Sequence, residues 1–130
     1  MASNPAVPFW DEANTITCHA SAAVTGKRFV AVSGPRVDGK PRVAHAVGSA
    51  TSRSLGVAAY DAPSGAKVSV YTGPGIVMPV TAAGAITAGQ DVYSDAQGRA
   101  TATQPTGARA AGVALDDAAD GTDAVIRINA

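Results

Sequence analysis

The feature that most constrains the fold is a pattern that occurs twice in the chain. Residues 56–70 match residues 112–126 without a gap. The matched positions include two glycines and one aspartate, namely Gly56 with Gly112, Asp61 with Asp117, and Gly65 with Gly121. A chain that repeats its turn residues at a fixed offset is expected to repeat a unit of tertiary structure.

The second copy of this pattern predicts a β-hairpin over residues 112–128. Apolar residues alternate on both sides of an acidic turn, which is the two-residue period of a half-buried strand. The two alternating sets are Ala111, Val113 and Leu115 before the turn, and Ala124, Ile126 and Ile128 after it. Asp120 and Gly121 form a favourable turn pair, because glycine accepts a positive φ and aspartate tolerates it.

The rest of the chain follows the same duplication. A strand expected at residues 27–32 has its echo at 90–94, and a glycine precedes each one (Gly26 and Gly89). The first copy then turns through a longer loop, residues 33–40, than the second. Turn residues recur every eight to twelve positions, and no segment keeps a helical period. We therefore predict an all-β protein, a compact small barrel or sandwich of short antiparallel strands, with pseudo-repeats at about 16–72 and 80–130.

Residues 1–15 do not belong to the repeat. Pro5 and Pro8 disfavour a helix and a central strand alike, because proline lacks the backbone N–H group. Phe9 and Trp10 are adjacent aromatic residues in a segment without periodicity, and such a pair needs a surface to lie on. We therefore expect an extended N-terminal arm ahead of a single β domain at 16–130. The arm is expected to dock on its own domain or on a neighbouring chain.

Charge and hydropathy exclude several classes of partner. Ten basic residues balance ten acidic ones, so the formal net charge is zero. Nucleic-acid-binding proteins usually carry a basic excess that neutralises phosphates, and we expect no nucleic-acid partner. No apolar run approaches the length that spans a bilayer, and the N-terminus lacks the pattern of a secretory signal. We expect no membrane partner, and a chain that stays in the cytoplasm where it is made.

Three short patterns resemble catalytic or ligand-binding motifs but fail on their chemistry. Residues 34–41 approach a phosphate-binding loop, yet Pro41 offers no hydroxyl to a magnesium ion and the loop joins two expected strands. Cys18 and His19 are neighbours on an expected strand, so their side chains point to opposite faces. With His45 they also fall short of a four-ligand zinc site, unless a carboxylate joins them.

An acidic loop, formed by Asp116, Asp117, Asp120 and Asp123, suggests calcium, but its spacing differs from that of an EF-hand. Turn formation and solubility explain these aspartates better. We therefore expect no catalytic residues, no cofactor and no metal site, and a protein that is not an enzyme. The candidate binding residues are those of the arm, which are Pro5, Pro8, Phe9 and Trp10.

Residues 88–101 (AGQDVYSDAQGRAT) and 107–115 (GARAAGVAL) form a distinctive pattern that continues to Ile126 and Ile128. On this pattern the chain resembles the small capsid decoration, or cement, proteins of tailed bacteriophages. The resemblance covers about residues 16–130 and, more loosely, the proline-rich arm. It implies a homotrimer on the outer surface of the assembled virion head that bridges subunits of the major capsid protein. The shell would be stabilised by mass action, because the ligand favours its assembled state. Pro5, Pro8, Phe9 and Trp10 would contact the capsid or a neighbouring copy.

Two other classes of function remain open from the sequence. A small β adhesion or carbohydrate-binding module displayed on a particle would need an exposed aromatic platform. Its candidate residues are Trp10, Tyr60, Tyr71 and Tyr93. A hydrolase or isomerase would instead need a pocket with converging titratable groups.

Overall fold

The computed structural model describes residues 15–129, and within that range the protein is built from ten β-strands without any helix. The prediction of an all-β fold is therefore confirmed. Because the described range has no helices, it has none long and apolar enough to cross a membrane. The strands are β1 (Thr15–Ala20), β2 (Phe29–Val37), β3 (Lys40–His45), β4 (Ser54–Ala58), β5 (Lys67–Tyr71), β6 (Val77–Thr81), β7 (Asp91–Ser94), β8 (Ala100–Thr101), β9 (Gly112–Ala114) and β10 (Asp123–Ile128).

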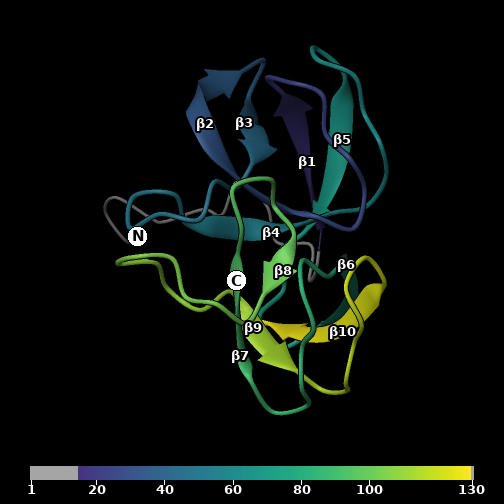
Figure 1. The fold of residues 1–130 in the computed structure, drawn as a ribbon. Coiled ribbons are helices and arrows are strands. Elements are labelled where there is room, and N and C mark those ends of the chain that lie inside the picture. Colours follow the sequence, from purple (N-terminus) through teal and green to yellow (C-terminus); the bar gives the residue numbers. More distant parts are fainter. Residues whose placement is uncertain (1–14, 130) are drawn as a thin grey trace, which may run out of the picture.

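The first five strands close into a small barrel in the order β1-β3-β2-β4-β5. Most neighbours in the barrel are antiparallel, as expected of short strands joined by tight turns. The barrel closes through a parallel pairing of β1 with β3, which joins His19 to Arg42 and Ala20 to Val43. In Figure 1 most of this barrel occupies the top of the view, and β4 crosses the middle.

The last five strands repeat this arrangement at the bottom of Figure 1. Their order, β6-β10-β9-β7-β8, is that of β1-β5-β4-β2-β3 in the barrel. The closing contact is again parallel, but it is reduced to one bridge between Ala82 and Ala100. The two pseudo-repeats predicted from the sequence are thus two five-stranded units with one topology. The first unit is closed, and the second is held at its seam by a single bridge.

The repeated turn residues make the same hydrogen bonds in both units. Backbone N–H groups of two glycines donate to matched alanine carbonyls, Gly65 to Ala20 at 2.7 Å and Gly121 to Ala82 at 2.9 Å. The matched aspartates also accept equivalent hydrogen bonds. Asp61 Oδ1 accepts from the Gly26 N–H and Asp117 Oδ1 from the Ala88 N–H, both at 2.8 Å. The two segments that match in sequence therefore also match in backbone hydrogen bonding.

Two hydrophobic clusters form the core, and the second one joins the units. The first cluster fills the barrel with residues that include Cys18, Val43 and Val68. The second fills the other unit, but it also takes in Phe29, Ala31 and Val57 from the outer side of β2 and β4. Phe29 is fully buried there, and its N–H donates to the Gly98 carbonyl at 2.7 Å. The outer wall of the barrel is thus part of the core of the second unit.

The structure corrects the face assigned to strand β9. Leu115 is 50% exposed and Val113 is half-buried, whereas Gly112 and Ala114 are the buried residues. The expected alternation exists, but the small residues face inward because β9 lies very close to β10. A side-chain carbon added at Gly112 would come within 2.5 Å of the Arg127 carbonyl oxygen. The other set, on β10, is buried as predicted (Ala124, Ile126 and Ile128).

Two further expectations about the first unit also change. The long loop predicted at residues 33–40 is a continuation of β2 and β3, joined by a two-residue turn at Asp38 and Gly39. Both turn residues have positive φ, 51° and 74°, which matches the tight turn that joins twisted strands. The counterpart of Gly89 is Lys27 rather than Gly26. Lys27 has a φ of 62° and donates to the Ala58 carbonyl as Gly89 does to that of Ala114.

Candidate functional site

The arm residues proposed from the sequence, Pro5, Pro8, Phe9 and Trp10, lie outside the described residues. The same holds for the boundary predicted between the arm and the β domain, since the description begins at Thr15. Both remain predictions.

The cysteine and histidine candidates do not form a reactive pair. Cys18 is fully buried inside the barrel, while the neighbouring His19 lies on the outer side of β1, as the alternation predicted. Burial raises the pKa of the Cys18 thiol to about 11, so the thiolate that a nucleophile or metal ligand requires is disfavoured. His45 Nε2 instead accepts a hydrogen bond from the Thr25 N–H at 2.9 Å. Cys18 and His45 therefore have structural roles, in the barrel core and in holding the Thr25 backbone.

The acidic loop is occupied by bonds to the protein itself. Asp117 and Asp120 each accept a backbone N–H at 2.8 Å, and Asp123 pairs with Lys27 at 2.7 Å. Asp116 accepts the N–H of the residue that follows it. Within residues 15–129, no group of three or more histidine, cysteine, aspartate or glutamate side chains is placed to hold a metal ion. The loop is thus a set of turn and inter-unit contacts.

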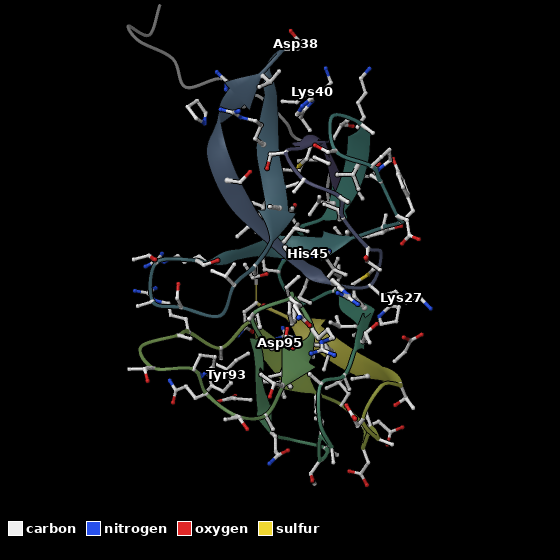
Figure 2. All side chains as sticks on the ribbon, turned by 45° about the horizontal axis from the view of Figure 1, so that its top comes forward. Lys27, Asp38, Lys40, His45, Tyr93 and Asp95 are labelled. Atoms are coloured by element: carbon white, nitrogen blue, oxygen red, sulfur yellow. The ribbon has the colours of Figure 1, made fainter. Side chains whose placement is uncertain are left out.

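The segment at residues 34–41 is a hairpin, as predicted, and not a phosphate-binding loop. Its tip, marked by Asp38 and Lys40 in Figure 2, lies at the end of the barrel far from Tyr93. The tyrosines considered for a carbohydrate platform are spread over both units, and Trp10, the fourth candidate, lies outside the described residues. Tyr71 and Tyr93 are half-buried in different units, and the exposed Tyr60 accepts the Ser69 N–H through its hydroxyl at 3.2 Å.

A shallow pocket of about 120 Å³ lies where loops of the two units meet. The loops before β4 and before β9 run side by side at the left of Figures 1 and 2. Two exposed arginines, Arg53 and Arg109, line the pocket together with serine hydroxyls. The chemistry suits a small anion or a carboxylate. No local pattern predicts this pocket, because its lining comes from loops far apart in the chain, around Arg53 and Arg109.

A second feature that was not predicted from the sequence is an exposed apolar surface on the second unit. We call it the apolar face, and it consists of the outward side chains of three neighbouring strands. These are Val77 and Pro79 from β6, Val125 and Arg127 from β10, and Val113 together with Leu115 from β9 and its end.

Strand pairing makes the apolar face continuous. Val125 stands opposite Pro79 on one side and bonds to Leu115 on the other, where the Leu115 N–H donates to the Val125 carbonyl at 2.9 Å. Val77, Leu115 and Val125 are 50%, 50% and 41% exposed. Adjacent exposed apolar side chains of this kind mark interaction sites more often than scattered ones do.

Comparisons with known proteins agree with this arrangement of two units. No curated protein matches the chain. The N-terminal base of the head fiber protein gp8.5 of bacteriophage phi29 has the same fold, with a TM-score of 0.71 and 24% identity over 88% of this chain and 92% of that one. The family model for phage cement proteins matches residues 10–129, which include both units. The resemblance noted in the sequence is confirmed, and the chain belongs to the phage cement protein family, as a capsid-associated structural protein of the virion.

Proposed function

We propose that this protein is made in the host cytoplasm, binds the outer surface of the assembled phage head as a homotrimer, and stabilises the head by bridging subunits of the major capsid protein. The observation that carries the proposal is the family match over both five-stranded units. A protein that binds only the assembled shell stabilises it in proportion to its occupancy, and it needs no catalytic group to do so.

The shared core supports the bridging role. The barrel contributes Phe29, Ala31 and Val57 to the interior of the second unit, so the two units are packed as one body. The Lys27 ammonium also reaches across to the Asp123 carboxylate. A clamp between two capsid subunits must resist their separation, and packed interiors transmit strain rather than yield to it.

The arm is the second element of the proposal. Pro5, Pro8, Phe9 and Trp10 would contact the capsid or a neighbouring copy, because aromatic side chains supply much of the binding energy of protein interfaces. The match to the family model begins at residue 10, so Trp10 lies within the region shared with the family.

The test uses purified undecorated heads. Labelled protein is titrated onto the heads, and the heat resistance of the decorated heads is compared with that of bare ones. We expect saturable binding and a higher disruption temperature. Non-saturable binding, or decorated heads that break at the same temperature as bare heads, would refute the proposal.

The contribution of the arm is tested with a deletion of residues 1–10. The matched control is the double variant V32S/V47S, which removes two exposed apolar side chains elsewhere on the surface. We expect the deletion to weaken head binding at least about tenfold, which corresponds to one or two lost anchor side chains. If the deletion variant and the control variant bind heads with equal affinity, the proposed role of the arm is refuted.

A further inference from the structure

The apolar face is not a requirement of the fold, because the first unit builds the same surface from other residues. The strand registers of the two units place all six positions of the apolar face in correspondence with positions on β1, β5, β4 and the end of β4. Val113 corresponds to Val57, and Arg127 corresponds to Tyr71. At the other four positions the first unit has polar or smaller side chains. The pairs are Thr15 with Val77, Thr17 with Pro79, Ala59 with Leu115, and Ser69 with Val125. The fold therefore does not require apolar side chains at these four positions of the second unit.

The apolar face also carries a cation without a partner among residues 15–129. Arg127 stands between Val77 and Val113 in the sheet, and its guanidinium lies over Gly75. No hydrogen bond or ion pair engages it within that range. Asp91 is the nearest carboxylate in the pairing, but it lies beyond Val113 on β7. An occupant of this face should therefore present apolar side chains and a carboxylate together.

One segment of the chain has that chemistry, namely Phe9-Trp10-Asp11-Glu12. Two aromatic side chains are followed directly by two carboxylates. Most of the other aspartates are already bonded to the protein: Asp61, Asp95, Asp116, Asp117, Asp120 and Asp123. Charge complementarity thus favours residues 9–12 as the occupant.

We propose that residues 9–12 of one copy bind the apolar face of a neighbouring copy, with Phe9 and Trp10 packed on Val125 and Leu115 and with a carboxylate of Asp11 or Glu12 paired with Arg127. The proposal rests on the proposed homotrimer and names its contact. The two surfaces are different parts of one chain, so the contact is heterologous, and a heterologous contact that closes forms a ring. Phe9 is six residues before Thr15, which gives a reach of about 20 Å from the start of β1.

The contact can be measured by tryptophan fluorescence. Trp10 is the single tryptophan of the chain, so the whole signal comes from this position. Acrylamide quenching of Trp10 is compared between the wild-type protein and the double variant L115A/V125S, which restores the residues of the first unit. The matched control is V32S/V47S. We expect Trp10 to be shielded from acrylamide in the wild type and the control, and exposed in L115A/V125S. The dissociation constant of the L115A/V125S trimer should be at least about tenfold higher than that of the wild type. Equal shielding in all three proteins would overturn the proposal.

A mixing experiment tests whether the arm crosses between copies. The variant W10F keeps its apolar face but is silent, while L115A/V125S keeps Trp10 but lacks the face. When the two are refolded together into mixed trimers, verified by a tag on one of them, we expect Trp10 to become shielded. A Trp10 that stays exposed in mixed trimers places the contact within one copy and overturns the proposal.

A failure of this contact can be distinguished from a failure of the proposed function. A wild-type protein that is monomeric at micromolar concentration would refute both the trimer and this contact. A trimeric wild type whose Trp10 is indifferent to the apolar face would refute this contact alone. Head binding is measured independently, and its failure would refute the proposed function.

Discussion

Replacing Gly112 by alanine is expected to destabilise the protein by about 3 kcal/mol, near the upper end of the usual cost of overpacking a core. An alanine Cβ at this position would lie 2.5 Å from the Arg127 carbonyl oxygen and 2.7 Å from Ile126 Cγ2. Both atoms belong to β10, which is held between β9 and β6 by its backbone hydrogen bonds. Neither of these atoms can move away from the added Cβ without disturbing the sheet. We therefore expect no relaxation that would reduce the loss of stability.

Gly121→Ala is the matched control, because it tests backbone strain without crowding. Gly121 has a φ of 79°, and nothing lies within 4 Å of an added Cβ. The left-handed conformation costs a non-glycine residue about 1–2 kcal/mol. Alanine also lowers the conformational entropy of the unfolded chain, which stabilises the folded state by about 0.4–1 kcal/mol. The net loss should therefore be about 1 kcal/mol. The first unit offers an independent replicate in Gly56→Ala, which is crowded by Tyr71, and Gly65→Ala, which is open.

Urea unfolding followed by circular dichroism measures these differences in the free energy of unfolding. In thermal unfolding of a chain of this size we expect the melting temperature to fall by about 10 °C for Gly112→Ala and by about 4 °C for Gly121→Ala. Equal losses for the two variants, or a loss below about 1 kcal/mol for Gly112→Ala, would refute the argument that close approach of β9 and β10 dictates the glycine.

Three further predictions concern the core and its titrating groups. Phe29→Ala should destabilise the protein by about 3–5 kcal/mol in urea unfolding, because it opens a cavity in the cluster that joins the two units. Cys18 should react with a thiol reagent only as fast as the barrel opens, and a rate equal to that of the denatured protein would contradict its burial. Burial, followed by the charge of Arg28, lowers the pKa of His45. The unfolded state then binds the proton more readily, so the stability that His45 contributes is present above about pH 6.5 and is lost as the pH falls below it. His45→Gln should flatten this part of the stability profile, and an unchanged slope would contradict the assignment.

The duplication was predictable because both units need the same residue types at the same turn positions. Gly65 and Gly121 both have positive φ. The Asp61 and Asp117 carboxylates each accept a backbone N–H from a segment far away in the sequence, that of Gly26 or of Ala88. The same residues therefore recur at a fixed offset along the chain. The face of β9 was predicted wrongly because a two-residue period identifies two faces without saying which one is buried. Leu115 is the larger residue, but only Gly112 fits against β10.

The sequence by itself determined the class of fold, the two repeats, the family and the absence of helical periodicity, since these depend on residue type and spacing along the chain. The tertiary structure alone decided how the repeats combine. It placed Phe29 of the barrel in the core of the other unit and brought two distant loops together around the arginine-lined pocket. It also assembled the apolar face from three strands, because the pairing of β6 with β10 and of β10 with β9 puts Val77, Leu115 and Val125 on one side of a sheet. Strand register depends on contacts between residues far apart in the chain, and no local pattern records it.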